Sequence, residues 1–410
     1  MPLLLKLCLS NFQNESRDYR ELSAAVEAGY QIKVLAGVLN SPGESGSIDE
    51  VYGYEVHRFD PFTKMKESYV STARAKKSIL KKFKRFFLNF NFVIRWVKKT
   101  KSFHADVVSC HDLHTLFIGY LANVFLRKSK KAKLVYDSHE FELGRSVSRN
   151  FLLSLIIRYT ERFLIKKSAF SIMVSDSIAD EVTKIHKLKT RPLVIRSTPL
   201  KWMIDTSVCE MRRNEYLKQF NVEFEPFILL YHGLIRKDRG IDTLIKVVSM
   251  NKNIVGIALG YALDDTYLDE VKKLIDNHNV ADRFILLPAI ENNRIWEFVG
   301  AADVGVNFGL NVCMSHKYSL PNKLFENIQS LTPVIVANVP EMRKIIEHYN
   351  IGLTCDSSNL TDINTCVEKM RTDKELYLKY KSNLITAKDE LCWENEKKGL
   401  VLAYKNLIAT

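Results

Sequence analysis

Residues 318–338 read YSLPNKLFENIQSLTPVIVAN and join a short polar helix to a buried strand. Pro321 is suited to open the helix, because its fixed φ fits the first turn and its missing N–H is not needed there. The β-branched run TPVIVAN is typical of a parallel strand that is covered on both faces. We therefore expect Asn322, Lys323 and Glu326 on the first two turns of a helix that packs beside a parallel sheet.

The alternation of apolar runs with amphipathic helical segments extends over the whole chain. Before residue 200, the runs predicted as strands are LLLKLCLS (3–10), QIKVLAG (31–37), ADVVSCHD (105–112), AKLVYDSHE (132–140), AFSIMVSD (169–176) and RPLVIRSTP (191–199). After residue 225, they are PFILLYHG (226–233), NIVGIALG (253–260), DRFILLPA (282–289), DVGVNFG (303–309) and TPVIVAN (332–338). Because a helix connects each strand to the next, both halves predict an α/β fold with a doubly wound parallel sheet.

At 410 residues the chain exceeds one comfortable hydrophobic core, which predicts two domains. We expect an N-terminal domain over residues 1–200 and a C-terminal domain over 201–375, with a linker near 198–225. Residues 376–410 read as a polar helical tail, and we expect this tail to pack back on the N-terminal domain. Open α/β sheets bind ligands outside the carboxyl ends of their strands, so two such domains facing a central cleft would place a site there.

The positive charge of the chain lies entirely in its first half. Residues 1–200 hold 34 Lys and Arg against 19 Asp and Glu, whereas residues 201–410 hold 26 against 28. Such asymmetry indicates a polyanionic partner, either nucleic acid or an anionic membrane surface. The ordinary composition excludes a disordered or fibrous protein.

Cysteine usage and hydropathy favour a cytoplasmic protein. The seven cysteines are scattered and include no CxxC pair, so neither a disulfide framework nor a zinc site is expected. The start MPLLLKLCLSNF is too short an apolar run for a secretory signal. No stretch approaches the roughly 18 to 20 apolar residues that span a bilayer, so any membrane contact is expected to be peripheral, on the inner face of the plasma membrane.

A basic, aromatic stretch over residues 76–101 reads KKSILKKFKRFFLNFNFVIRWVKKTK. It combines ten Lys and Arg with six aromatic residues and no acidic residue, which is typical of a helix that lies on an anionic membrane. The residues expected to face the membrane are Lys81, Lys82, Lys84, Arg85, Phe86 and Trp96. Two alternatives stay open at this point, namely a helix packed in the core with solvated lysines and a nucleic-acid-binding helix.

Three motifs in chain order carry a family resemblance. LVYDSHEF (134–141), YHGLIRKDRGIDTLI (231–245) and PNKLFENIQSLTPVIVANVPEMRKII (321–346) resemble the retaining glycosyltransferases of family 4, which have the GT-B fold of two Rossmann-like domains. The resemblance implies transfer of a hexosyl or related group from a nucleotide-sugar donor, held by the C-terminal domain, to an acceptor on the N-terminal domain. It further implies a lipid-linked or saccharide acceptor, as in surface-polysaccharide assembly, with no cofactor and no metal, and it disfavours a nucleic-acid partner, so none is expected.

The resemblance assigns donor contacts to the C-terminal half. Glu326 matches the family glutamate that accepts hydrogen bonds from the ribose hydroxyls, and Arg239 matches a basic residue at the diphosphate. The dipole of the helix that follows Pro321 favours the same phosphates. The full set of expected donor-binding residues is Gly233, Arg236, Arg239, Tyr318, Asn322, Lys323 and Glu326.

The N-terminal half supplies the residues expected near the reacting sugar. His139 matches a family histidine that hydrogen-bonds a donor hydroxyl, and Asp137 and Glu140 are expected to orient it or contact the acceptor. His111 and Asp112 form a second polar loop, for which helix capping is as good an explanation as function. Arg17, in the loop after the first strand, is expected near the donor phosphate.

Several positions depart from the family pattern. Tyr318 stands where members commonly carry a second glutamate, and Leu234 stands where an arginine often follows the glycine of the turn. Arg236 is then expected to supply that charge. These departures leave two alternatives open, a catalytically weak GT-B-like subunit that binds a membrane or partner, and a nucleotide-sugar epimerase on the same fold.

Overall fold

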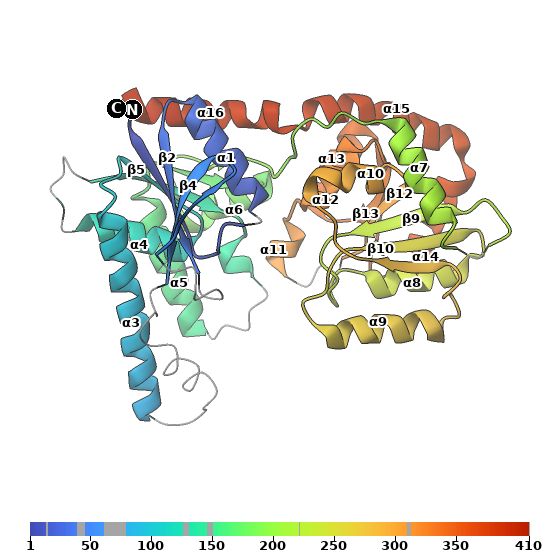
Figure 1. Cartoon of the computed structure of the whole chain (residues 1–410), viewed down its shortest axis with the longest axis horizontal. Helices are drawn as coiled ribbons and strands as arrows, with labels where there is room; N and C mark the ends of the chain where they lie inside the picture. Colours follow the sequence, from blue (N-terminus) through green and yellow to red (C-terminus); the bar gives the residue numbers. More distant parts are fainter. Residues whose placement is uncertain are drawn as a thin grey trace. The chain divides into compact units, whose positions relative to one another are not determined.

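The computed structural model of the chain describes all residues except 14, 39–45, 61–78, 125, 127–130, 146–150, 221, 310–312 and 410, and it describes residues 79–89 without their side chains. The chain forms two compact units (Figure 1). The first unit comprises Met1–Leu143, Val147–Ile195 and Lys397–Thr410, and the second comprises Gly144–Ser146 and Arg196–Glu396. Each unit is built around its own sheet, as the sequence predicts.

In the sheet of the first unit, the apolar strand β1, with the sequence LLLKLC, is largely buried and lies between β2 and β5. In spatial order the strands are β3 (Ile48–Val51), β4 (Tyr54–Phe59), β2 (Gln31–Gly37), β1 (Leu3–Cys8), β5 (Val107–Cys110), β6 (Lys133–Ser138), β7 (Phe170–Met173) and β8 (Leu193–Val194). Only β3 and β4 pair antiparallel among the described strands. The sequence did not predict this hairpin, because its edge strand alternates exposed and half-buried positions and offers little apolar signal.

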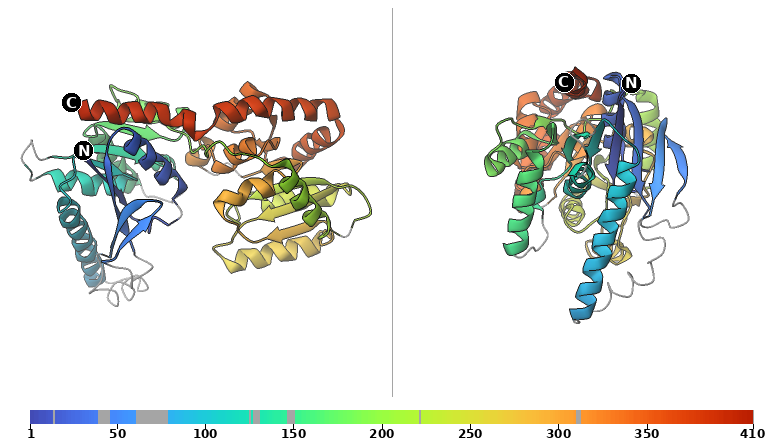
Figure 2. Two further views of the ribbon diagram at one scale, coloured as in Figure 1. Left: turned by 45° about the horizontal axis from the view of Figure 1, so that its top comes forward. Right: turned by 90° about the vertical axis from the view of Figure 1, so that its left-hand side faces the viewer.

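Helices cover the first sheet on both faces. They are α1 (Ser16–Glu27), α3 (Ile79–Lys101), α4 (Leu113–Val124), a short 3-10 turn at Glu142–Gly144, α5 (Phe151–Ile165) and α6 (Asp176–His186). Helices α3 and α5 flank α4 in one layer (Figure 2, right). No helix in the described part of the chain has the length and apolar character that crossing a bilayer requires.

The C-terminal helix α16 (Trp393–Ala409) enters the first unit at Lys397. Tyr404 on this helix is buried, its backbone oxygen accepts a hydrogen bond from the Tyr30 hydroxyl at 3.1 Å, and its ring meets that of Phe170 edge-on. Lys397 and Glu27 form an ion pair at 2.6 Å. The preceding helix α15 (Lys374–Glu390) packs in the core of the second unit instead, where Leu384 and the residues around it are buried.

The second unit holds a six-stranded, fully parallel sheet between two layers of helices. Its strands are, in spatial order, β11 (Phe284–Leu287), β10 (Ile254–Leu259), β9 (Phe227–His232), β12 (Val304–Asn307), β13 (Val334–Ala337) and β14 (Gly352–Cys355). Its helices before α15 are α7 (Thr206–Leu217), α8 (Ile241–Met250), α9 (Asp265–Asn277), a 3-10 turn at Asn292–Arg294, α10 (Ile295–Val299), α11 (Met314–Lys317), α12 (Asn322–Gln329), α13 (Pro340–Tyr349) and α14 (Leu360–Thr372).

The segment expected as a linker near 198–225 contains α7, which is an integral part of the second unit. Tyr216 is buried and donates a hydrogen bond to the Phe298 carbonyl at 3.1 Å. Arg213 reaches Asp303 at 3.1 Å. The sequence pattern of α7 does not reveal these contacts, because the helix is mostly polar and only Cys209 and Tyr216 of its twelve residues are buried.

Strand order reverses once in each sheet. The chain leaves β1 toward β2 on one side and returns to β5 on the other, and it leaves β9 toward β10 and returns to β12. Ligands of open α/β folds bind at such points, outside the carboxyl ends of the strands. The residues that follow β5 and β6 in the first unit, and β9 and β12 in the second, are therefore the candidates for function.

Candidate functional site

A buried ionic cluster lies at the carboxyl ends of β1, β5 and β6 in the first unit. At its centre the ammonium of Lys6 lies 2.8 Å from Asp18, 3.3 Å from Glu21 and 3.4 Å from Asp137. All of these side chains are buried. A buried ammonium is tolerated only when opposite charges surround it, which these three carboxylates do.

The electrostatics of the cluster follow from this arrangement. Burial opposes the charged form of Lys6, but the carboxylates of Asp18, Glu21 and Asp137 outweigh it and hold the pKa of Lys6 above its ordinary value. Burial likewise opposes ionisation of Asp18, yet Lys6 and His111 lower its pKa. Burial and the neighbouring Asp137 raise the pKa of Glu21. Burial also opposes ionisation of Asp137, yet His139, Arg17 and Lys6 hold its pKa well below its ordinary value, so both aspartates are ionised at neutral pH.

Each of these aspartates holds one histidine. Nδ1 of His111 lies 2.9 Å from Oδ2 of Asp18, and Nε2 of His139 lies 2.6 Å from Oδ2 of Asp137. The two imidazole rings are neighbours, with their centroids 3.7 Å apart. Burial lowers the pKa of His139, whereas for His111 the Asp18 carboxylate overcomes burial and raises the pKa.

The other N-terminal residues singled out in the sequence have varied surroundings. Arg17 lies in the first turn of α1 rather than in the preceding loop, is 7% exposed, and contacts Glu21 at 2.8 Å, Asp137 at 3.2 Å and the Ile195 carbonyl at 2.8 Å. This geometry ties Arg17 to the ionic cluster, and its contact with a donor phosphate stays a prediction.

Asp112 and Glu140 lie outside the cluster. The Asp112 carboxylate accepts a hydrogen bond from the Thr115 backbone N–H at 2.8 Å, and the Thr115 hydroxyl lies 3.0 Å from the Asp112 backbone N–H. This reciprocal pair caps α4, so Asp112 has the structural role that the sequence left open. Glu140 is exposed directly after His139.

The ligand atoms of Asp18, His111 and His139 lie within 4.8 Å of one another, a spacing that a metal ion could use. The Lys6 ammonium, 2.8 Å from Asp18, already supplies the positive charge that a metal would bring. The donor set is therefore better explained as an ion network. That the reaction needs no metal stays a prediction.

In the second unit, the turn after β9 brings Gly233 against Lys323 of α12. Gly233 has φ +115°, which a residue with a side chain rarely adopts, and a Cβ there would lie 3.8 Å from the Lys323 amine. That amine lies 3.8 Å from the centroid of the Tyr231 ring. Burial, reinforced by the charge of Arg239, lowers the pKa of Lys323 to about 7.

One turn further along α12, Glu326 meets the end of β9. Its Oε2 lies 2.8 Å from Nε2 of His232, a residue that is 3% exposed and that the sequence interpretation missed. The sequence did contain an indication of this residue, since His232 is the last residue of a buried strand and directly precedes Gly233. The pair fixes one carboxylate oxygen of Glu326, which is itself only partly buried.

The remaining expected donor contacts surround the same turn. Arg236 forms a two-pronged ion pair with Asp238, at 2.6 and 2.5 Å, and Arg239 lies 3.8 Å from that carboxylate. The Arg236 pair lowers the pKa of Asp238.

Two further expected residues lie near the start of α12. Tyr318 follows α11, and Asn322 is exposed in the first turn of α12, whose N-terminal end no side chain caps. The structure thus gathers the predicted residues Gly233, Arg239, Lys323 and Glu326 at one end of the sheet.

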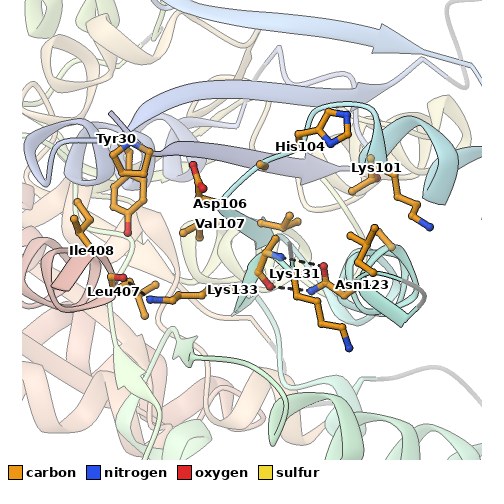
Figure 3. A pocket seen from close by; sticks show the side chains of 17 residues that line it. Tyr30, Lys101, His104, Asp106, Val107, Asn123, Lys131, Lys133, Leu407 and Ile408 are labelled. Carbon is orange, nitrogen blue, oxygen red and sulfur yellow. Dashed lines mark hydrogen bonds between the residues drawn. The ribbon is translucent and has the colours of Figure 1, made fainter. Parts of the chain in front are cut away.

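In the first unit, a pocket of about 720 Å³ lies where the strands of the sheet begin, at the edge opposite the ionic cluster (Figure 3). Its lining includes Tyr30, Lys101 and Lys131, and Asn123 shapes one wall by two hydrogen bonds with Ala132. None of the expected site residues lines this pocket.

The helix expected within residues 76–101 is present as α3, its contact with a membrane stays a prediction, and the expected exposure of Trp96 is wrong. Trp96 is fully buried and meets the ring of Phe59 edge-on at 5.2 Å, because this face of the helix packs on the sheet. The side chains of Lys81, Lys82, Lys84, Arg85 and Phe86 lie outside the described residues.

Two family models match the chain. The model described as Glycosyltransferase Family 4 matches residues 20–197, and the model described as Glycosyl transferases group 1 matches residues 212–386. A comparison with curated protein sequences finds no match.

Solved structures similar to this chain are glycosyltransferases or related enzymes. HepE from Anabaena in complex with UDP has a TM-score of 0.71 at 14% identity, with 100% of this chain and 98% of that chain covered. Sucrose-phosphate synthase from Thermosynechococcus elongatus has a TM-score of 0.75 at 13% identity, with 100% of both chains covered. The catalytic domain of starch synthase IV from Arabidopsis thaliana, bound to ADP and acarbose, has a TM-score of 0.72 at 11% identity, also with 100% of both chains covered. With two parallel sheets matched in order by the family-4 and group 1 models, this chain belongs to the family-4 type of GT-B glycosyltransferases, whose fold binds nucleotide sugars.

Proposed function

We propose that this chain is a retaining, metal-independent glycosyltransferase that moves a hexosyl or related group from a nucleotide-sugar donor to a lipid-linked or saccharide acceptor in polysaccharide assembly. The observation that carries the proposal is the arrangement after β9, where Lys323 and Glu326 of α12 lie against Gly233 and His232.

The chemistry of sugar transfer explains why these groups are useful. The departing nucleoside diphosphate gains negative charge, and a fixed cation stabilises that charge where water is excluded. Lys323, whose pKa of about 7 a bound diphosphate would raise, supplies this cation in the complex, and Arg239 and the N-terminal end of α12 add positive potential nearby. No metal is needed in this scheme, because side chains and a helix end supply the charge.

Glu326 is suited to the ribose of the donor. An ionised carboxylate only accepts hydrogen bonds, and two neighbouring ribose hydroxyls can each donate one to it. His232 fixes Oε2 of Glu326 from the buried side, which reduces the conformational freedom that binding must remove. The similar structure of HepE is a complex with UDP, which supports a uridine nucleotide as the first candidate.

Helix α5 supports a membrane-bound acceptor. Four apolar side chains one or two turns apart are exposed on it, namely Leu152 (66% exposed), Ile156 (54%), Tyr159 (64%) and Phe163 (46%). Arg158, Lys166 and Lys167 are exposed beside them, whereas the only acidic residue of the helix, Glu161, is buried. An apolar stripe between cations is typical of a helix at an anionic lipid surface. The proposed location is therefore the inner face of the plasma membrane.

A thermal-shift panel of nucleoside diphosphates tests the donor site. A nucleotide at a hundredfold excess over its dissociation constant should stabilise the wild type by roughly 2.7 kcal/mol. Glu326→Ala should abolish the shift. Glu368→Ala is the matched control, because Glu368 is a helical, ion-paired glutamate on α14, on a different helix from the site. If no nucleotide shifts the wild type, or if Glu326→Ala shifts as the wild type does, the proposal is wrong.

A further inference from the structure

Lys6 connects two carboxylates that each hold one imidazole ring. Its Nζ lies 2.8 Å from Asp18 and 3.4 Å from Asp137. Asp18 contacts Nδ1 of His111 at 2.9 Å, and Asp137 contacts Nε2 of His139 at 2.6 Å. A single buried ammonium therefore supports both histidines of the cluster.

The contact between Asp137 and His139 fixes the position of a hydrogen. An ionised carboxylate can only accept, so Nε2 of His139 must be the donor. When the ring is neutral, its other nitrogen, Nδ1, carries a lone pair and no hydrogen. Within the described residues, Nδ1 of His139 has no hydrogen-bond partner, and the side chain is 20% exposed.

We infer that Lys6 is a positioning residue for His139: together with Arg17, which also contacts Asp137, it keeps Asp137 ionised and so fixes the tautomer in which Nε2 donates to Asp137 and Nδ1 accepts a hydrogen bond from a substrate hydroxyl. The inference rests on the proposed sugar transfer, because hydroxyls are the hydrogen-bond donors that a sugar brings. It specifies the direction of the hydrogen bond between His139 and the sugar, since His139 then accepts this bond and does not donate it.

His111 completes the arrangement by taking the positive charge. With centroids 3.7 Å apart, the two rings cannot both be charged without strong repulsion. Asp18 raises the pKa of His111 despite burial, whereas burial and His111 lower that of His139. Arg17 and Glu21 of α1 also belong to this cluster: they pair with each other at 2.8 Å, and Arg17 contacts Asp137 at 3.2 Å as a second cation. Of the two rings, His111 therefore binds an additional proton first.

Nitrogen-15 NMR of the imidazole rings in the wild type is the first test, with His139→Gln used to assign the signal. At about pH 7.5 we expect His139 to be neutral, with its hydrogen on Nε2. A hydrogen on Nδ1, or a doubly protonated ring at that pH, would overturn the inference. This measurement needs no variant other than the one used for assignment.

Two variants then test the role of Lys6. Lys6→Met removes the cation beside both aspartates, so the pH at which His139 binds a second proton should rise by about one to three units. Lys6→Arg keeps the charge and should stay near the wild type. Glu161→Gln is the control, because Glu161 holds another buried histidine of this unit, His186, at 3.0 Å. A folded Lys6→Met protein with unchanged His139 titration contradicts the inference, and if this variant does not fold, the wild-type tautomer decides.

Activity provides a second readout. The acid limb of the pH profile of kcat should move to higher pH in Lys6→Met and return in Lys6→Arg, whereas a merely structural loss would lower the rate at every pH. The two proposals fail in different experiments. If a nucleotide binds but His139 carries its hydrogen on Nδ1, the role of Lys6 is wrong and the proposed sugar transfer is not. If no nucleotide binds, the proposed sugar transfer is wrong, and the NMR measurement still reports the tautomer of His139.

Discussion

The ammonium of Lys323 lies 3.8 Å from the centre of the Tyr231 ring, beside the turn that follows β9. The face of an aromatic ring attracts a cation, but burial and the nearby Arg239 lower the pKa of Lys323 to about 7. Lys323 is therefore poised between its charged and neutral forms near neutral pH. A bound diphosphate would favour the charged form.

Nucleotide binding should take up a proton near pH 8. There a large fraction of Lys323 is neutral in the free protein, and a diphosphate raises its pKa again. Calorimetric titration in two buffers of different ionisation enthalpy measures the uptake, which should approach one proton per site at about pH 8 and fall toward zero at about pH 6. Lys323→Arg stays charged throughout, so an equal uptake in that variant would contradict the prediction.

The same shift predicts a pH dependence of stability. The folded-state pKa of Lys323, about 7, lies below its ordinary value of 10.5, so between these values the unfolded chain binds more protons than the folded chain. The contribution of Lys323 to the free energy of unfolding therefore rises with pH across this window. Lys323→Met should flatten this rise relative to the wild type in denaturant titrations, and an unchanged slope would show that Lys323 titrates normally.

Removing the support of Glu326 should weaken nucleotide binding without abolishing it. His232→Phe deletes the hydrogen bond to Oε2 of Glu326 while keeping a ring in the buried position. Because this hydrogen bond is already present before the nucleotide binds, its loss mainly adds the cost of ordering Glu326, about 0.5 to 1.5 kcal/mol, so the dissociation constant should rise by roughly two- to tenfold. Titration calorimetry measures the change, and a double variant with Glu326→Ala should lose little further through His232 if the two residues act together.

Gly240 should tolerate no side chain. This residue begins α8 with φ +79°, and a Cβ there would lie 2.6 Å from the Phe308 carbonyl oxygen. Gly53 is the matched control, because it has φ +78° and nothing within 4 Å of the added atom. Gly53→Ala should cost about 1 kcal/mol for the backbone strain alone, and Gly240→Ala clearly more. Equal losses in thermal unfolding would show that Phe308 moves aside.

The apolar stripe of α5 should bind anionic lipid. Ile156→Glu and Phe163→Glu place carboxylates among exposed apolar groups, so they should release the protein from phosphatidylserine-containing vesicles in a sedimentation assay. Ile385→Glu is the control, because Ile385 is an exposed isoleucine on α15 in the second unit. Unchanged sedimentation of both α5 variants, or binding that is equally strong on neutral vesicles, would argue for a protein partner instead.

The sequence predicts the parallel sheets well, because their strands are apolar runs that solvent never reaches, as in ILLY of β9 and VIVA of β13. Its failures share a different cause. Lys6 reads as an exception in an apolar strand, and its three carboxylate partners come from residues up to 131 positions away. Trp96 reads as an interfacial aromatic, although the sheet beneath α3 buries it completely. Contacts between distant segments decide both cases, and no local pattern encodes them.

The donor side was more accessible to prediction, because the family resemblance assigns Lys323 and Glu326 to it and Gly233 directly follows the buried strand β9. The fold then brings the turn after β9 against α12. His232 was passed over because a histidine inside a strand more often has a structural role. Its partner Glu326 is 94 positions away, so only the fold reveals the pair.

The path of α16 has a consequence for the order in which the chain is made. Residues Met1–Leu143 of the first unit are synthesised before Arg196–Glu396 of the second unit, yet Tyr30 and Phe170 of the first unit are covered by Tyr404. Until Tyr404 has been synthesised, the apolar surface around these rings stays open to water and to other chains. The second unit, in contrast, has all of Arg196–Glu396 available by then. The unit begun first is therefore completed last, and ribosomes stalled just before Lys397 should carry a first unit that proteases digest readily.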